Sequence, residues 1–329
     1  MKKAVFVSLL LFLSLIAQAF DFSINKLKYT LNPRDSTVSV SAQSTFQPSG
    51  DLEIASIVEF NGKIYRVSGI SDWGFLGCTN LKSVTINDGV SFIGNHAFQD
   101  CCNLTSVDIS SSVTQIQTGS FAGCSALSSV KIPSGLTSIW GSAFSDCCSL
   151  TSITLPNGLL TIGNRAFEAC DKLSSIFIPS SVIRIGEGAF GYCVAMKEYA
   201  VAKNNRSFME KDGVLLTKDF KTLVAYPNAK SKKYSIPEGV RIIGEGAFGG
   251  CMSLTTLTIP SSLTWMPGLV FWDCSSLKTI IFHTEMPPKV DVSMPSIMNK
   301  DACVLLVPKG SREAFVNADF WKDFKKIKD

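Results

Sequence analysis

The amino-acid sequence predicts a solenoid of stacked 23-residue coils, with a parallel β-sheet along one face, short, 3-10 or helical turns opposite it, and few long helices. The first observation is a cysteine that recurs at this spacing, at Cys78, Cys101, Cys124, Cys147, Cys170 and Cys193, and again at Cys251 and Cys274. The second is a fixed order before the cysteines, so that Ile93, Phe98 and Cys101 correspond to Ile116, Phe121 and Cys124. A constant period of about 20–50 residues is the signature of stacked repeats.

Each repeat is predicted to form a short strand, a turn and a second inward-facing stretch. In the unit 124–146, Val130 and Ile132 alternate with polar residues as in a half-buried strand. Pro133 ends that strand, because proline donates no ladder hydrogen bond. Phe144 follows on a tight turn and should point into the stack. A lone unit buries too little to offset the ordering of its backbone, about 1–2 kcal/mol per residue, so stacking is obligatory.

The cysteines are expected to form a column of mostly reduced thiols inside the stack. Eight of the eleven share one phase of the repeat, and parallel side chains on successive coils do not face each other as a disulfide requires. In two repeats, a second cysteine directly follows the cysteine of the column, at Cys102 and Cys148. They should lie two coils apart, roughly 10 Å, which is too far to bridge. A zinc site is not expected, because the chain has no C-x-x-C pair and only two histidines.

The chain is predicted to consist of a leader, two caps and the repeat array. Residues 1–19 are expected to be a signal peptide, because a basic start precedes a short apolar run that ends in Ala17-Gln18-Ala19. Residues 20–77 are expected to form an N-terminal β cap with the first half-repeat, in which Asn61-Gly62 marks a hairpin turn. Residues 283–329 should form a C-terminal cap with an apolar strand and a short helical tail.

The array itself, residues 78–282, is interrupted once. Cys193 and Cys251 are 251 − 193 = 58 residues apart, which is 58 − 23 = 35 more than one repeat. Within this insertion, at about 200–234, the apolar runs 214–216 and 223–226 flank a polar turn and indicate a β-hairpin. Because Ile236 resumes the repeat in phase, we interpret the segment as one enlarged coil.

Composition argues against a nucleic-acid or polybasic membrane binder. The chain has 31 Lys and Arg against 27 Asp and Glu, and without Lys2 and Lys3 the difference is 29 − 27 = +2. This charge is close to neutral for the size of the chain. No other apolar stretch is long enough to cross a bilayer, which takes about 20 residues.

Motifs that carry chemistry are not assembled in this sequence. Residues 186–191 and 244–249 each spell G-x-G-x-x-G, which alone would suggest a dinucleotide loop. We interpret them as turns, since the same phase elsewhere reads 94–99 and no long crossover helix follows. Carboxylates such as Glu168 and Asp171 fall on turns without convergent partners. A regular stack supplies no water-poor pocket, so neither an enzyme nor a cofactor or metal site is expected.

The outward positions of the first strand offer a candidate recognition surface. One column is rich in hydroxyl groups, at Ser83, Ser106, Ser129, Ser152, Ser175, Thr256 and Thr279. An ordinary solvated β face would show the same residues. Exposed aromatic side chains at phases where other repeats are polar or small are the stronger signal, because such residues are enriched at binding hot spots. The candidate interaction residues are Phe92, Trp140, Phe177, Tyr192 and Trp265, with Asp108 and Lys131 on the strand face.

The repeat resembles the BspA-type leucine-rich repeat of exported bacterial proteins. The motif L-x-x-I-x-I-P-x-x-V-x-x-I-G-x-x-A-F-x-x-C is matched by residues 173–193. The ending, with Pro287-Pro288 and Val307-Pro308-Lys309-Gly310, resembles versions typical of the Bacteroides group. The resemblance covers nearly the whole chain after the leader and implies a leucine-rich-repeat solenoid.

Members of this family are generally taken to be surface interaction or adhesion proteins, so the resemblance implies an exported, non-enzymatic binding protein. Its location would be the cell surface, the medium or the periplasm. The expected partner is another protein, from the host matrix or a bacterial surface. A glycan-binding surface module is the alternative, motivated by the hydroxyl-rich faces and by Trp140 and Trp265. An enzyme is the third hypothesis.

Overall fold

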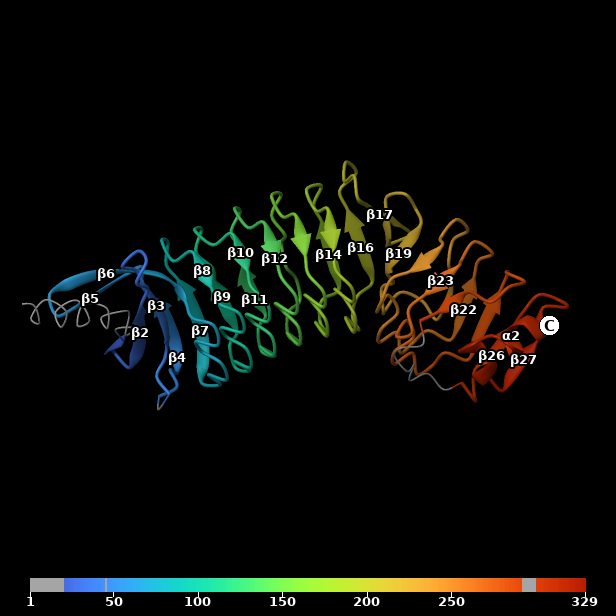
Figure 1. The fold of residues 1–329 in the computed structure, drawn as a ribbon, viewed down its shortest axis with the longest axis horizontal. Coiled ribbons are helices and arrows are strands. Elements are labelled where there is room, and N and C mark those ends of the chain that lie inside the picture. The colour runs from blue at the N-terminus through green and yellow to red at the C-terminus, as the bar shows by residue number, and fades with distance from the viewer. Residues whose placement is uncertain (1–20, 45, 292–299) are drawn as a thin grey trace, which may run out of the picture.

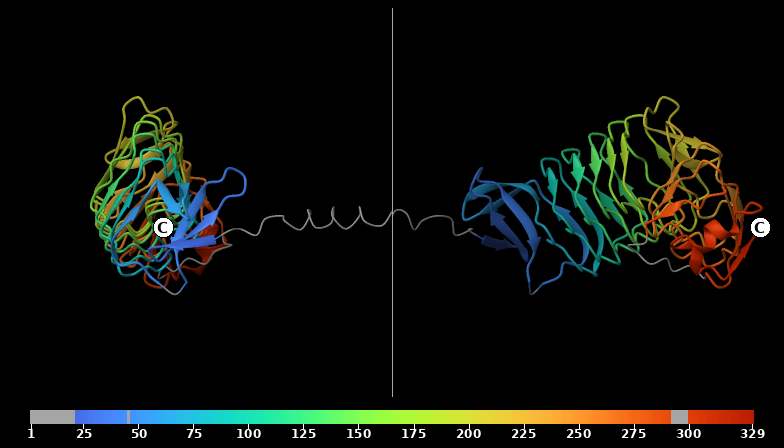
Figure 2. Two further views of the ribbon diagram at one scale, coloured as in Figure 1. Left: turned by 90° about the vertical axis from the view of Figure 1, so that its left-hand side faces the viewer. Right: turned by 45° about the vertical axis from the view of Figure 1, so that its right-hand side comes forward.

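The computed structural model describes residues 21–44, 46–291 and 300–329; the predicted signal peptide lies outside them. The coils stack into one elongated array (Figure 1), and they superimpose in a view along it (Figure 2, left). Most coils contribute a strand to each of two faces, which we call the first-strand and second-strand faces, and close through a tight turn. The predicted solenoid of stacked coils is confirmed.

The first-strand face consists of three parallel ladders. The strands of the first are β4 (Gly50–Ile54), β7 (Leu81–Ile86), β9 (Ser106–Asp108) and β11 (Ser129–Lys131). The second pairs β14 (Ser175–Ile178) with β16 (Glu198–Val201), and the third contains β20 (Lys233–Ser235), β22 (Thr256–Ile259), β24 (Thr279–Phe282), β26 (Val304–Leu306) and β27 (Lys326–Lys328). Ser83 pairs with Ser106 and Ser106 with Ser129, so the register follows the repeat period.

The second-strand face is built from two-residue strands. Its central ladder contains β10 (Gln115–Ile116), β12 (Ser138–Ile139), β13 (Thr161–Ile162) and β15 (Arg184–Ile185). Before it, β8 (Phe92–Ile93) pairs with β6 (Lys63–Ile70). After the insertion, β21 (Ile242–Ile243), β23 (Trp265–Met266) and β25 (Lys289–Val290) continue from β19 (Thr222–Ala225). After its second strand, each coil returns through tight turns. These turns are closed by backbone hydrogen bonds between residues three apart, as from the Cys101 amide to the Phe98 carbonyl at 3.2 Å.

Both ends of the array are capped. The N-terminal cap contains the antiparallel pair β1 (Asp21–Ile24) and β2 (Leu27–Leu31), then β3 (Val38–Ala42), and the predicted hairpin of β5 (Ile57–Phe60) and β6 (Lys63–Ile70). At the C-terminus, α2 (Arg312–Val316) and the 3-10 turn η1 (Trp321–Asp323) bury Phe315 and Trp321 against the last coil. The Trp321 indole donates to the Pro288 carbonyl at 2.9 Å and fixes this tail.

The insertion adds three strands between the two parts of the array. β17 (Phe208–Lys211), β18 (Val214–Thr217) and β19 (Thr222–Ala225) pair antiparallel in this order, and β19 joins β21 in parallel. β18 is buried on both sides: Leu215 belongs to the apolar cluster of the preceding coils, while Val214 and Leu216 belong to that of the following coils. The insertion therefore packs against both apolar cores and separates them.

The interior is filled by a stack of phenylalanine rings, as the sequence predicts. Neighbouring rings from Phe75 through Phe98, Phe121, Phe144 and Phe167 to Phe190 lie 5.1–5.8 Å apart at interplanar angles of 2–8°. All of these side chains are buried. Fully burying a large apolar side chain stabilises by about 1.5–3 kcal/mol, so this stack is a main favourable contribution to folding.

The predicted cysteine column lies beside the phenylalanine stack. From Cys101 to Cys193, each column thiol donates to the carbonyl of the phenylalanine in the preceding coil, as Cys101 does to Phe75 at 3.2 Å and Cys193 to Phe167 at 3.1 Å. Burial raises the pKa of the Cys78 and Cys193 thiols to about 12, so they are protonated at neutral pH. Cys102 is exposed and Cys148 half-buried, outside the column.

Candidate functional site

Besides its interruption at the insertion, the first-strand face opens at one earlier coil. The sequence predicts Ser152 on a strand of this face, but within the described residues the segment 151–155 pairs with neither β11 nor β14. The second-strand ladder continues through the same coil, where Thr161 pairs with Ser138 and with Arg184. Because one ladder is kept and the other is lost, the coils spread apart on the first-strand face at this point.

This opening forms a groove, which we call the β11–β14 groove. It has a volume of about 730 Å³ and is lined by residues 128–132, 134 and 152–158 and by Phe177. Ile153 and Leu155 remain buried beneath it. In the described part of the chain, the backbone amides of residues 151–155 donate no hydrogen bond to protein. Such amides are strong donors that need a partner, so the groove offers hydrogen bonds to water or to a ligand.

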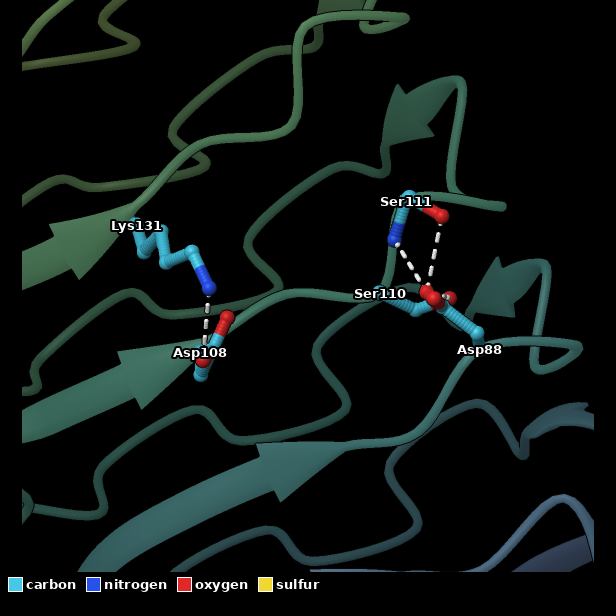
Figure 3. A network of polar contacts seen from close by, with 5 residues as sticks. All are labelled: Asp88, Asp108, Ser110, Ser111 and Lys131. Carbon is cyan, nitrogen blue, oxygen red and sulfur yellow. Dashed lines mark hydrogen bonds and ion pairs between the residues drawn. The ribbon is translucent and has the colours of Figure 1, made fainter.

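A second hollow of about 420 Å³ adjoins the groove along the same face. It is lined by residues 85–88, 108–111 and 131–134, so Lys131 belongs to both hollows. The Lys131 ammonium lies 3.0 Å from a carboxylate oxygen of Asp108 on the neighbouring strand (Figure 3). Both side chains are well exposed, and such pairs contribute about 0–1 kcal/mol to stability. The pair is thus available to meet charges on a partner.

The polar network at the far edge of this hollow has a structural role. Asp88 accepts hydrogen bonds of 2.8 Å from both the backbone amide and the hydroxyl of Ser111 (Figure 3). These bonds lower the pKa of the Asp88 carboxyl. Glu238 accepts the same two bonds from Ser261 in a later coil. In both parts of the array, a carboxylate thus accepts the same two hydrogen bonds from a serine of the next coil and ties the two coils together.

The structure brings together only part of the predicted interaction residues. Asp108, Lys131 and Phe177 share the first-strand face, and Phe177, 52% exposed, lines the β11–β14 groove. Phe92 and Trp265 lie on second-strand elements, at 44% and 38% exposure.

The two other predicted aromatic residues lie elsewhere. Trp140 directly follows β12, is 38% exposed, and donates its indole N–H to the Gln115 side chain at 3.1 Å. Tyr192 is half-buried on the turn side. The seven residues therefore do not form one patch.

The prediction that the carboxylates stay apart is wrong at one place. Glu168 lines a pocket of about 280 Å³ on the turn side, together with Glu187, Glu245 and Tyr192. Both G-x-G-x-x-G segments contribute to this pocket. The signal was visible in the sequence as two neighbouring coils with glycine at matching positions, but it was interpreted only as turn geometry.

Other polar candidates are already engaged. His96 bonds through Nδ1 to the Gln99 side chain at 2.7 Å and stacks on Trp73 at 5.6 Å between ring centroids. Over the described ranges, no group of three His, Cys, Asp or Glu residues is arranged to hold a metal ion. In the same ranges, no helix has the length and apolar character that spanning a bilayer requires.

The fold and its open face define a leucine-rich-repeat β-solenoid, a class of protein that presents an extended surface. The family model described as "BspA type Leucine rich repeat region" matches the chain in six copies, over residues 56–147, 119–211 and 224–288. The chain belongs to this family. A search of curated proteins finds no match.

Several solved bacterial structures share the fold. A leucine rich cell surface protein from Faecalibacterium prausnitzii is 24% identical, with a TM-score of 0.61 over 90% of this chain and 86% of that one. A leucine-rich repeat protein from Eubacterium ventriosum is 22% identical, with a TM-score of 0.61 over 86% and 76%. The pneumococcal vaccine antigen PcpA is 19% identical, with a TM-score of 0.59 over 88% and 82%. At these identities, the likeness is one of fold.

Proposed function

We propose that this protein is an exported, non-enzymatic binding protein that engages another protein through the β11–β14 groove. The observation that carries the proposal is the open coil 151–155, whose unpaired backbone amides lie between the exposed Phe177 ring and the Lys131–Asp108 pair. The groove thus combines main-chain donors, an aromatic anchor and both signs of charge in one place.

A polypeptide partner suits this combination best. An extended segment can satisfy unpaired strand amides with its own main-chain carbonyls, while side-chain contacts give specificity. Phe177 supplies the kind of aromatic anchor that dominates interface energetics. The family and the solenoid fold, which spreads its surface over many coils, also favour macromolecular binding over catalysis.

Export and a surface location belong to the same proposal. It is supported by the predicted signal peptide at residues 1–19 and by the fold shared with a protein described as a cell surface protein. Protease shaving of intact cells tests the location: we expect the protein to be cleaved from the surface while a periplasmic marker stays intact. Protection of both until the cells are lysed would contradict a surface location.

The binding proposal is tested with a panel of purified host matrix proteins and bacterial surface proteins. Wild-type protein and a Phe177→Ser variant are compared for binding to each panel member by biolayer interferometry. We expect one partner whose affinity falls about 30-fold in the variant, the loss of a hot-spot anchor of about 2 kcal/mol.

Phe92→Ser is the matched control, because Phe92 is similarly exposed but lies on the second-strand face. We expect it to bind as wild type does. An equal loss in both variants, or a folded wild-type protein that binds no panel member, would count against the groove. A glycan array addresses the glycan alternative: binding there that depends on Trp265 would replace the proposal.

A further inference from the structure

Two neighbouring coils lack outward side chains at the same two positions of the turn. Directly after the stacked phenylalanine, successive coils carry Gln99, Ala122, Ser145, Glu168, Gly191, Gly249 and Trp272. Two residues before it, they carry His96, Gly119, Ser142, Arg165, Gly188, Gly246 and Leu269. Since the coils of Gly188 and Gly246 are adjacent, through a backbone bond of 3.0 Å from Gly188 to Glu245, the missing side chains leave a slot two coils wide.

We call this pocket the glycine slot. Arg165 and Glu168 form one wall, and Leu269 and Trp272 form the other. The floor admits no side chain at Gly246, because a Cβ there would lie 2.9 Å from the Gly188 Cα. The slot has a volume of about 280 Å³, at the small end of ligand pockets, which hold about 300–1,000 Å³. It has room for one side chain or a small molecule.

The charge lining the slot is negative. Glu168, Glu187 and Glu245 face a single guanidinium, Arg165, so the lining carries 1 − 3 = −2 when ionised. The Arg165 Nε lies 4.0 Å from a Glu168 oxygen, whereas among the described residues Glu187 and Glu245 form no ion pair. Burial, and then the neighbouring Glu187, raise the pKa of the Glu245 carboxyl against the opposing effect of Arg165. A bound cation would relieve the repulsion between the Glu187 and Glu245 carboxylates.

The aromatic residues narrow the class of ligand. Tyr192 and Trp272 line the slot with the carboxylates, and a cation over an aromatic face is attracted by the ring. A phosphate does not fit, because the carboxylates repel it and the amides of Gly188, Gly191 and Gly249 already donate to protein carbonyls. Gly191 donates to the Gly188 carbonyl, and Gly249 to the Gly246 carbonyl, both at 2.9 Å. The G-x-G-x-x-G segments therefore form no nucleotide site.

We propose that the glycine slot binds a small organic cation, a guanidinium or ammonium group on an aliphatic stem. The aliphatic part would lie on the glycine floor beside Leu269, and the cation would meet Glu245 and the face of Trp272. Such a group is carried either by an arginine or lysine side chain of another protein or by a free polyamine. This site lies on the turn side and does not depend on the β11–β14 groove.

The test compares three probes by saturation-transfer NMR with the full chain: agmatine, the blocked peptide acetyl-Gly-Arg-Gly-amide, and the same peptide with uncharged citrulline. We expect agmatine or the arginine peptide to bind, and the citrulline peptide to give no signal. Tighter binding of agmatine would identify a free amine as the source, and tighter binding of the arginine peptide a protein side chain. Equal binding of the citrulline peptide, or no binding of either cation, would overturn the proposal.

Variants then locate the site. Glu245→Gln removes one charge at constant shape and should weaken cation binding at least about fivefold. Gly191→Gln restores the kind of side chain that Gln99 supplies in an early coil, and should abolish binding by filling the slot. Ala122→Gln places the same side chain at the equivalent position of a coil outside the slot and should leave cation binding unchanged. An unchanged affinity for the cation in correctly folded Glu245→Gln protein would place the site elsewhere.

Discussion

The coils before and after the insertion share one sequence pattern but differ in their packing. Before it, five successive ring pairs are almost parallel, with angles of 2–8°. After it, Phe248 and Phe271 lie 6.2 Å apart and are tilted by 41°. Both regions keep the thiol–carbonyl bond, as from Cys274 to Phe248 at 3.2 Å. The ring geometry is therefore more sensitive to its surroundings than the backbone of the coil.

The neighbour of the coil explains the difference. In the regular part, the amide of Phe167 donates to the Ala189 carbonyl of the next coil at 2.8 Å. At the insertion, the amide of Tyr226 takes the corresponding place against Ala247, at 2.9 Å, and its ring packs on Phe248 at 5.1 Å. A tyrosine from a different backbone context thus starts the second stack. Coils with the same sequence pattern therefore stack their phenylalanine rings in the same way only when the coil before them has that pattern too.

The largest expected effect comes from removing one ring in each region. Phe121→Ala should lower the free energy of unfolding by about 3–5 kcal/mol, because it leaves a cavity in a closely packed core. Phe271→Ala should lower it by about 1 kcal/mol less, since Phe121 stacks on two rings and Phe271 on one, and each ring pair adds about 0.5–1.5 kcal/mol. Urea unfolding followed by circular dichroism measures both. Equal losses would mean that ring stacking does not distinguish the two regions.

A smaller effect, with opposite signs, is expected at two tyrosines, one directly before the insertion and one within it. Tyr199 has a buried hydroxyl that finds no hydrogen-bond partner among the described residues, whereas the Tyr226 hydroxyl donates to the Ser231 carbonyl at 3.2 Å. Tyr199→Phe should therefore raise the free energy of unfolding by about 1 kcal/mol, and Tyr226→Phe should lower it by about as much. Thermal unfolding of the two variants gives the comparison. A destabilised Tyr199→Phe protein would reveal a partner for that hydroxyl.

The smallest effect concerns pH at the junction of the two regions. Burial, and to a lesser extent Asp146, raise the pKa of Glu168 against the opposing effect of Arg165. A raised folded-state pKa means that the folded protein holds this proton more tightly. The ionised carboxylate is therefore destabilising above that pKa, and this penalty disappears as the pH falls towards the unfolded value of about 4.3.

Glu168→Gln should accordingly raise the free energy of unfolding at pH 7.5 by about a few tenths of a kcal/mol, seen as a slightly higher melting temperature. The increase should be smaller at pH 4. Glu238→Gln is the control of opposite sign, because hydrogen bonds from Ser261 lower the pKa of Glu238. Its variant should melt lower at pH 7.5, with the difference shrinking as the pH falls through the lowered pKa. Differential scanning fluorimetry across this range checks both; a pH-independent shift at Glu168 would contradict the assignment.

The periodic part of the fold could be predicted from the sequence because each coil depends mainly on its own residues and on its two neighbours. Phe121 and Cys124 identify a buried column by spacing alone, and the structure buries both. The N-terminal pair β1–β2 was missed. Its turn, Asn25-Lys26, adopts positive φ at two residues without a glycine to signal it.

The two candidate sites could be predicted less well, for different reasons. The segment 151–155 has the sequence of an ordinary repeat strand, so its lost pairing reflects how successive coils spread and is not encoded in local residue types. The glycine slot was visible as matched glycines at 188 and 246, but its significance depends on the insertion of 35 residues, 58 − 23, looping out so that these coils become neighbours.

The shielded thiols have a consequence for how the chain must reach its final state. Folded, nine of the eleven sulfhydryls are buried beyond the reach of oxidants; unfolded, all of them are open to random cross-linking in an oxidising environment. For a protein exported as proposed, correct maturation is thus a competition between coil stacking and oxidation. Once lost, the native state should be recoverable only in the presence of a reductant, and the working lifetime of the molecule in an oxidising environment is then governed by its unfolding rate.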